Sequence, residues 1–259
     1  MKVSVILPVF KRASLLDLGL KSLSMQKIYY PFEILVINDG IEDETEAVCD
    51  KYPELNIRYI FSGQRNKDEI VFRTPAFAFN IGIKQSTGDI VMLSNPEIFH
   101  LTDTMHELLA PLDVSDSFIT SPANIMFDNT GKTLKYLREH FTLDLPAHIS
   151  DDLEKNNARC KYASRLPFCI ALEKKHLIEI GGYDEDYSGW ACDDDDIIDR
   201  LILKGLSFFY VNSSIIHLYH AKQYERGNRK HPKFLHNYNI YMKKKGTIIR
   251  NEGKDWGKL

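Results

Sequence analysis

Cysteine is scarce in this sequence and is not arranged for metal binding or for a disulfide framework. The four cysteines lie far apart and show no Cys-x-x-Cys spacing. Their positions are Cys49, Cys160, Cys169 and Cys192. Small secreted domains are much richer in disulfides, so this usage favours a reducing compartment.

Long apolar runs are also missing. No stretch approaches the roughly 18 consecutive apolar residues that a membrane-spanning helix needs. The opening "MKVSVILPVFKR" has one charge before a short apolar run that ends at proline, which is typical of a β-strand and not of a signal peptide. We expect a cytoplasmic protein, with a position at the inner face of the membrane as an alternative.

A strong charge of one sign is absent as well. The formal net charge is −3, which gives no electrostatic reason to expect a nucleic acid partner. The one basic region is a C-terminal extension, residues 226–259, which ends in "YMKKKGTIIRNEGKDWGKL". This extension could make a peripheral contact with an anionic membrane, but a solvated tail is the favoured interpretation.

The sequence has no glycine-rich phosphate loop of the form GxGxxG or GxxxxGK[ST], which argues against a dinucleotide dehydrogenase and a P-loop NTPase. What it does have is alternation of strand and helix patterns through its first hundred residues. Strands are predicted at 2–8, 32–40, 56–61 and 89–97. Helices are predicted at 14–27, at 42–52, and after Thr74 as the cap with Pro75 in the first position.

This order predicts an α/β fold with a mostly parallel sheet flanked by helices, in one extended domain. Such sheets bind ligands beyond the carboxyl ends of their strands. The residues to inspect there are Pro8 to Lys11, Asp39, and Asn95 to Glu97.

The second half is less regular, and residues 101–165 carry no recognisable chemistry. A Gly-Gly turn is predicted at 181–182, and "DDDDIIDRLILKG" predicts a helix that begins with four aspartates and stops at Gly205. Judged locally, the aspartates could simply favour the positive end of the helix dipole. Residues 206–220 are aromatic and β-branched, which predicts one strand leading into His217 and His220.

Several segments together resemble the nucleotide-binding half of inverting GT-A glycosyltransferases of family 2. They are "VSVILPVFKR", "SLSMQ", "FEILVINDG" and "RTPAFAFNIGIKQSTGDIVML", followed by an acidic turn. A later segment, "GGYDEDYSGWACDDDDIIDRL", is similar to the acceptor segment of β-1,4-galactosyltransferases and N-acetylgalactosaminyltransferases. The resemblance implies a GT-A (Rossmann-like) domain with a nucleotide-sugar-binding half at 1–100 and an acceptor-binding and catalytic half at 101–225.

The resemblance also implies the role of the acidic segment. Trp190 and Gly189 would contact the acceptor, Asp193 would take the family's glutamate position, and Asp194 would be the catalytic base. Asp195 and Asp196 would then only cap or charge the helix. The glycine pair that the family has before these acids is replaced here by Ala191 and Cys192.

On the donor side, the resemblance implies a nucleotide site in which Asp39 accepts the imide N–H of uracil. A turn-forming aspartate before a glycine is the local alternative. The other residues implied for nucleotide binding are Pro8, Val9, Phe10, Arg12 and Arg73.

The metal site implied by the resemblance departs from the family pattern, because "NPE" replaces Asp-x-Asp and leaves only Glu97 as an anionic ligand. His220 is the first choice for the histidine ligand and His217 the second. Imidazole and carboxylate together suit Mn²⁺, with Mg²⁺ as the alternative. The i, i+3 spacing of the histidines is one-sided on a helix but not on a strand, so both can ligate only if the backbone turns.

The resulting prediction is a metal-dependent, inverting glycosyltransferase. It would transfer a hexose or an N-acetylhexosamine, of the galactose, GalNAc or GlcNAc type, from a UDP-sugar to a glycan or glycolipid acceptor. A catalytically inactive protein that binds a sugar nucleotide or a glycan is the alternative. A sugar nucleotidyltransferase is more distant, because "LPVFKRASLL" lacks the glycine-rich signature such enzymes need near the first strand.

Overall fold

The computed structural model describes residues 1–63, 74–113, 116–120, 125–127, 131–160, 168–188, 190–211, 213–220 and 229–259. In this part of the chain, a seven-stranded sheet has the order β3-β2-β1-β4-β8-β6-β9. The strands are β1 Val3–Val9, β2 Phe32–Asn38, β3 Ile57–Phe61, β4 Ile90–Ser94, β6 Ser117–Thr120, β8 Cys169–Glu173 and β9 Ser207–Tyr210.

The large sheet is mostly parallel. β1 pairs in parallel with β2 and β4, and β2 pairs in parallel with β3. Only β8 is reversed, because it runs antiparallel to both β4 and β6, while β9 is parallel to β6. The predicted α/β fold with a mostly parallel sheet is confirmed.

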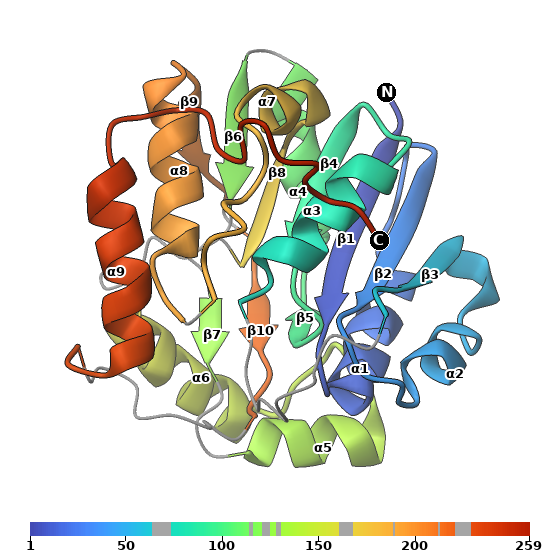
Figure 1. Ribbon diagram of the computed structural model, residues 1–259. Helices are drawn as coiled ribbons and strands as arrows, with labels where there is room; N and C mark the ends of the chain where they lie inside the picture. Colours follow the sequence, from blue (N-terminus) through green and yellow to red (C-terminus); the bar gives the residue numbers. More distant parts are fainter. Residues whose placement is uncertain are drawn as a thin grey trace.

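A second, three-stranded sheet lies beyond the carboxyl ends of the parallel strands (Figure 1). Its strands are β5 Ile98–His100, β10 Ile215–His217 and β7 Ile125–Phe127, with β10 in the middle. The prediction of one strand over 206–220 is therefore wrong. β9 extends the large sheet beside β6, whereas β10 pairs with β5 and β7, so the two ends of this segment have different partners.

Helices cover both faces of the large sheet. Alternate β1 residues, among them Val5 and Leu7, pack toward α1 (Ala13–Ser24), α2 (Thr45–Cys49) and α4 (Thr104–Leu109). Ile6 faces the other way, toward α3 (Ala76–Gln85), α7 (Lys174–Glu179) and α8 (Asp193–Leu203). Burial of each such aliphatic side chain contributes ~1.5–3 kcal/mol, so the two layers hold the strand ends in fixed positions.

The remaining helices flank the smaller sheet and the front of the domain. α5 (Lys132–His140) and α6 (Ala147–Cys160) lie near the three-stranded sheet, and α9 (Pro232–Lys244) runs beside α8 (Figure 1). Two short 3-10 segments complete the order, Pro53–Leu55 and Ala110–Asp113. None of the helices in the described ranges is long and apolar enough to cross a bilayer.

The C-terminal residues are not a solvated extension, so that prediction is wrong for this part of the chain. Asn251 donates from its Nδ2 to the carbonyl oxygens of Gly181 (2.8 Å) and Tyr183 (2.7 Å). Gly181 has a positive φ of 77°, and a Cβ at this position would overlap the backbone of Arg250. The predicted Gly-Gly turn is thus where the end of the chain packs onto the domain.

Candidate functional site

The loop after β4 carries the first candidate residue. Asn95 and Pro96 lead into Glu97, which is only 5% exposed and directly precedes β5. Helix α1 approaches this loop closely, because a Cβ at Gly19 would lie 2.8 Å from the carbonyl oxygen of Pro96. Glycine in α1 therefore lets the loop sit against the helix, and the carboxylate is fixed at the edge of the sheet.

Strand β10 brings two histidines to the same carboxylate. The backbone N–H of Leu218 donates to the Glu97 carbonyl oxygen (2.8 Å), which aligns the end of β10 with the loop. His217 Nε2 and His220 Nε2 each lie 3.7 Å from Glu97 Oε1, and the two rings are 5.2 Å apart. The chain leaves the strand after His217, so both side chains reach one point despite their i, i+3 spacing. We call Glu97, His217 and His220 the histidine cluster.

Arg12 is a further member of this neighbourhood. Its guanidinium forms an ion pair with Glu97 and lies 3.5 Å from His220 Nδ1. Burial alone would raise the pKa of the Glu97 carboxyl, but the positive charge of Arg12 and, when protonated, of the two histidines outweighs burial and lowers that pKa. The carboxylate is therefore charged at neutral pH.

The histidine cluster fits a divalent cation. One ligand atom from each of its three residues lies within 4.8 Å of the others. Glu97 Oε2 is buried and accepts no hydrogen bond from the described residues, so an acceptor is left without a donor. Two imidazoles and one carboxylate are donors that suit Mn²⁺ better than Mg²⁺.

The predicted nucleotide side lies at the ends of β1 and β2. Asp39 is 2% exposed, its N–H donates to the Val9 carbonyl oxygen (2.8 Å), and it accepts a hydrogen bond from Ser62 Oγ (3.1 Å). Pro8 and Val9 are buried within β1, so they shape this edge with their backbone, and Phe10 is half-buried. Arg73 lies outside the described residues.

The four aspartates begin α8, as predicted. The backbone holds Asp193 at the first position of the helix, where Thr74 Oγ1 donates to its Oδ2 (2.6 Å). Thr74 was predicted to cap α3, and that is wrong, because the cap position is Pro75 and the threonine hydroxyl bonds across the site instead. We call residues 193–196 the aspartate turn.

Burial, together with the nearby carboxylates, raises the pKa of two side chains in the aspartate turn. Burial raises the pKa of Asp194 well above its ordinary value, and the charges of Asp193 and Asp195 add to the rise. Burial also raises the pKa of Asp193, although the hydrogen bond from Thr74 opposes the shift. These side chains therefore hold protons more readily than an exposed aspartate does.

Asp196 is not a simple helix charge, and the prediction that it only caps α8 is wrong. Its two oxygens accept hydrogen bonds from Arg200 Nε (2.7 Å) and Arg250 Nη2 (2.6 Å). All three side chains are almost fully buried, and Arg250 also lies 3.3 Å from Asp184. A buried ion-pair network thus ties the aspartate turn to the C-terminal segment.

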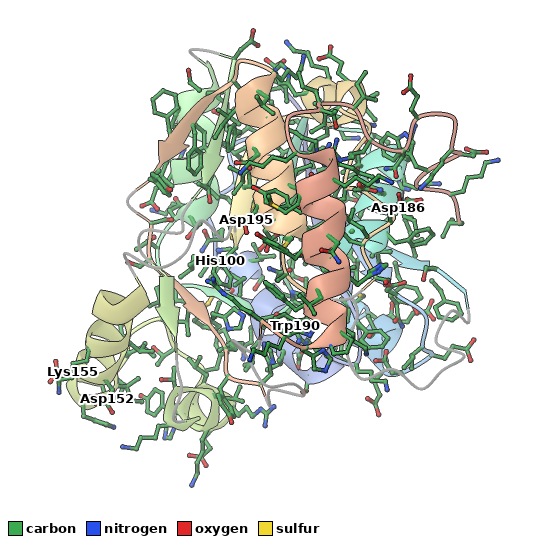
Figure 2. All side chains as sticks on the ribbon, turned by 60° about the vertical axis from the view of Figure 1, so that its left-hand side comes forward. His100, Asp152, Lys155, Asp186, Trp190 and Asp195 are labelled. Carbon is green, nitrogen blue, oxygen red and sulfur yellow. The ribbon has the colours of Figure 1, made fainter. Side chains whose placement is uncertain are left out.

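Trp190 lies beneath α9. The indole is 7% exposed, and its ring centroid is 5.3 Å from that of Phe234 and 6.0 Å from that of His231. Figure 2 shows Trp190 beside the N-terminal end of α9 and Asp195 in the first turn of α8. Little of the ring is open to an acceptor in this structure. Gly189 lies outside the described residues.

The residues that replace the glycine pair retain the conformation that favours glycine. Ala191 and Cys192 both have φ of 71°, in the left-handed region. Asn237 Nδ2 on α9 donates to the Ala191 carbonyl oxygen (3.0 Å), which holds this strained connection in place. These two left-handed residues lead directly into Asp193, the first residue of α8.

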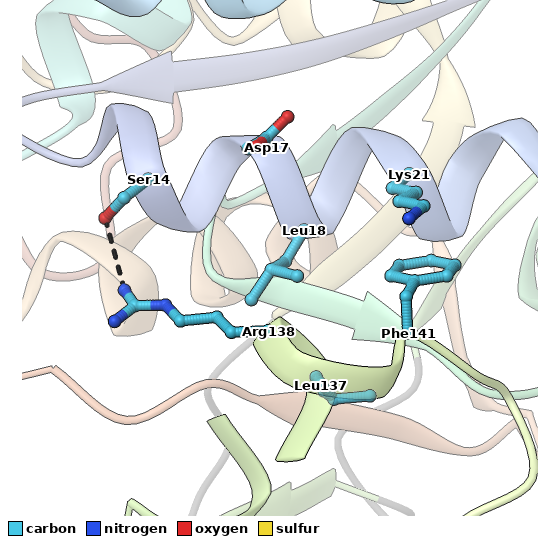
Figure 3. A pocket seen from close by; sticks show the side chains of 7 residues that line it. All are labelled: Ser14, Asp17, Leu18, Lys21, Leu137, Arg138 and Phe141. Carbon is cyan, nitrogen blue, oxygen red and sulfur yellow. Dashed lines mark hydrogen bonds between the residues drawn. The ribbon is translucent and has the colours of Figure 1, made fainter. Parts of the chain in front are cut away.

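A cavity of about 320 Å³ lies between α1 and α5 (Figure 3). Lys21 lies 3.6 Å from the centre of the Phe141 ring, and Arg138 Nη2 lies 3.5 Å from Ser14 Oγ. The described residues that line this cavity include none of the predicted site residues. The lining is Ser14, Asp17, Leu18, Lys21, Leu137, Arg138 and Phe141.

Comparison with known sequences gives two matching families. A profile of Glycosyl transferase family 2 matches residues 4–181, and one described as the N-terminal domain of galactosyltransferase matches residues 147–223. The chondroitin synthase of Pasteurella multocida (strain Pm70) is 24% identical over 238 residues, which are 82% of this chain and 24% of that protein. The hyaluronan synthase of Pasteurella multocida is 27% identical over 247 residues, 85% of this chain and 24% of that protein. The chain thus spans about a quarter of the length of these relatives.

A third relative matches a shorter part of the chain. Human beta-1,4-galactosyltransferase 1 is 33% identical over 70 residues, 27% of this chain and 18% of that protein.

Solved structures share the fold at low sequence identity. The mannosyltransferase PcManGT from Pyrobaculum calidifontis, in complex with GDP-Man and Mn²⁺, has a TM-score of 0.58 and 16% identity, covering 86% of this chain and 58% of that one. A mutant Drosophila β1,4-galactosyltransferase 7, in complex with manganese, UDP-Gal and xylobiose, has a TM-score of 0.53 and 13% identity, covering 88% and 77%. Both are similar to this chain in their GT-A architecture.

Proposed function

Because the chain belongs to glycosyl transferase family 2, we propose that it is a metal-dependent, inverting enzyme that uses a UDP-sugar. The transferred group is a hexose or an N-acetylhexosamine of the galactose, GalNAc or GlcNAc type, and the acceptor is a glycan or a glycolipid. One observation carries the proposal: Glu97, His217 and His220, from two distant parts of the chain, converge at the edge of the sheet where such folds bind ligands.

The metal in this proposal is Mn²⁺, held by the histidine cluster. When bound, such an ion neutralises the charge that develops on the departing diphosphate. The buried Glu97 Oε2, which accepts no hydrogen bond from the described residues, is the oxygen that a cation would satisfy. Support comes from two structures of similar fold, which contain manganese together with a sugar nucleotide.

On the donor side, Asp39 accepts the imide N–H of uracil and thereby selects the base. The carboxylate is held at the end of β2 by Ser62 and by its own backbone bond to Val9. Arg12 lies beside the histidine cluster, where its guanidinium can exchange Glu97 for a diphosphate oxygen. Both contacts position the donor before any bond breaks.

Asp194 is the general base in this account. Its carboxylate takes the proton of the acceptor hydroxyl as the hydroxyl oxygen attacks the anomeric carbon and the bond to the diphosphate oxygen breaks. One displacement inverts the anomeric configuration, so no covalent intermediate forms. Burial and the neighbouring carboxylates raise the pKa of Asp194, so this side chain binds a proton more readily than an exposed aspartate does.

The acceptor is expected to be a growing polysaccharide. Two relatives that match most of this chain are synthases of chondroitin and hyaluronan, although this chain covers only about a quarter of each. The segment before the aspartate turn, with Trp190, is the acceptor side of the site. Phe234 of α9 and His231, which directly precedes the helix, cover one side of that ring.

A catalytically inactive protein that binds a sugar nucleotide or a glycan is the second candidate. Two observations favour it: Asn95 stands where the family has its first metal-binding aspartate, and Glu97 already has Arg12 as a counter-ion. Such a protein would bind UDP-sugars without consuming them.

A screen of UDP-sugars without acceptor, with and without Mn²⁺, tests the proposal by measuring free UDP. Enzymes of this kind slowly transfer the sugar to water, so we expect UDP release with at least one UDP-hexose, and only with metal. Binding without release in every case would support the inactive protein. Release that persists undiminished in excess EDTA would contradict metal dependence.

A further inference from the structure

A second group of potential metal ligands lies at the opposite edge of the large sheet. Glu173 is the last residue of β8, His176 lies in the following helix α7, and Asp116 directly precedes β6. Because β8 runs opposite to its neighbours, these residues gather at the edge away from the histidine cluster, around α7 in Figure 1. One ligand atom of each lies within 4.8 Å of the others.

The distances between these atoms match those of a small divalent cation. His176 Nε2 lies 3.4 Å from Asp116 Oδ1 and 3.9 Å from Glu173 Oε2. Tetrahedral ligands with bonds of ~2.0–2.2 Å to zinc are separated by about 3.4 Å. Small side-chain rotations would therefore let all three atoms reach one ion.

The imidazole is an independent indication of a ligand. His176 is 4% exposed, and neither of its ring nitrogens makes a hydrogen bond with the described residues. Buried polar groups are normally hydrogen-bonded, whereas this ring faces Asp116 and Glu173 at 3.4 and 3.9 Å, which is longer than a good N–H···O hydrogen bond. On its other side, Nδ1 lies 3.8 Å from Glu179 Oε2. A carboxylate in that position commonly orients a metal-bound histidine.

The two carboxylates already attract a cation. The Lys175 ammonium lies 3.4 Å from Asp116 Oδ1 and forms an ion pair with Glu173. The lysine side chain is 54% exposed, so it can leave for solvent at little cost. Its ammonium marks a place where positive charge is favourable, and a metal ion would compete with it.

We propose that Asp116, Glu173 and His176 form a second metal site, separate from the histidine cluster and selective for a zinc-like divalent cation. Imidazole with carboxylates suits Zn²⁺, and exposed Asp116 leaves a fourth position for water. A bound ion would clamp β6 and β8 to α7, far from the proposed chemistry.

Zinc binding by the whole protein tests this site. Equilibrium dialysis at neutral pH against Zn²⁺, followed by elemental analysis, gives the bound equivalents. We expect His176→Gln and Asp116→Asn each to lose one equivalent relative to the unchanged chain. Asp116 is 69% exposed at its side chain, so its variant should fold even if the buried histidine variant does not. His140→Gln, at an exposed histidine on α5, is the matched control and should lose none.

A substitution that should increase zinc affinity sharpens the test. Lys175→Gln removes the competing ammonium and should tighten zinc binding by about two- to fivefold, the size of an exposed ion pair. If His176, Asp116 and Glu173 form only ion pairs, no zinc should bind at this place. Equal zinc content in the unchanged chain, His176→Gln and Asp116→Asn would overturn the proposal, whatever the histidine cluster binds.

Discussion

The histidine cluster and the aspartate turn place carboxylates in opposite electrostatic surroundings. Glu97 meets Arg12 and two histidines, and these charges lower its pKa in spite of burial. Asp194 meets other carboxylates, and burial together with their charge raises its pKa. The neighbours therefore decide which carboxylate stays charged and which binds a proton more readily.

The same comparison explains why four consecutive aspartates are not equivalent. Asp196 is neutralised by two buried arginines, and Asp193 is held by the Thr74 hydroxyl. The Asp194 side chain has no such partner among the described residues, as the proposed role of a base requires.

The largest effect is expected for Asp194. Asp194→Asn keeps the shape of the side chain but removes the proposed base, so transfer to the acceptor should fall by roughly 10²- to 10⁴-fold. The raised pKa also predicts that the activity of the unchanged enzyme falls as pH decreases through that pKa, because the base becomes protonated. Initial rates of transfer across a pH series measure both effects.

Asp195→Asn is the matched control, since it removes a neighbouring charge without removing the base. Its rate should remain close to that of the unchanged enzyme. Equal losses in the two variants would show that the aspartate turn does not single out Asp194.

The next effect concerns the fixed carboxylate. Arg250→Met leaves Asp196 and Asp184 short of a buried counter-charge, which should lower the free energy of unfolding by about 3–5 kcal/mol. Lys258→Met removes only the exposed ion pair with Asp255 and should cost less than ~1 kcal/mol. Urea titration measures both. Similar midpoints for the two variants would mean that the buried network does not hold the C-terminal segment.

A smaller effect should separate donor binding from chemistry. Asp39→Ala removes a charged hydrogen-bond acceptor worth ~1.5–3 kcal/mol, so UDP affinity should fall by roughly 10- to 150-fold. The pH profile of transfer, which depends on the aspartate turn, should keep its shape. Calorimetry with Asp50→Ala, at an exposed site, provides the control. Unchanged UDP affinity in folded Asp39→Ala would refute the role of Asp39.

The smallest effect tests the strained entry to the aspartate turn. Ala191→Gly relieves a positive φ that costs an L-residue ~1–2 kcal/mol, although glycine gains entropy in the unfolded chain. The net gain should be at most ~1 kcal/mol, or roughly 2–4 °C in Tm. Ala78→Gly, inside α3, should lower Tm instead. A lower Tm for Ala191→Gly would show that Ala191 is not strained.

Local patterns in the sequence were sufficient for much of the fold. Alternating strand and helix signals, with prolines and glycines at their ends, predicted the parallel half and the helix at the aspartate turn. These features depend on neighbours within a few residues. The residues that end strands, such as Glu97, could therefore be singled out before any contact was known.

Contacts between distant residues could not be predicted in this way. Thr74 and Asp193 are 119 residues apart, and Arg12 and Glu97 are 85 apart, so no local pattern links them. The split between β9 and β10 depends on which strands they pair with. One feature of the sequence could have indicated that the C-terminus is packed. Ile248 and Trp256 are apolar residues within a basic segment, and both pack against the core.

A Mn²⁺ titration of Glu97→Gln tests whether the histidine cluster binds the proposed catalytic metal. The substitution keeps the size of the side chain and removes its charge, while the histidines remain. We predict that the Mn²⁺ concentration for half-maximal UDP release rises by roughly 10- to 100-fold or more, with the fold unchanged by circular dichroism. An identical Mn²⁺ dependence in the two proteins would show that Glu97 does not bind the metal.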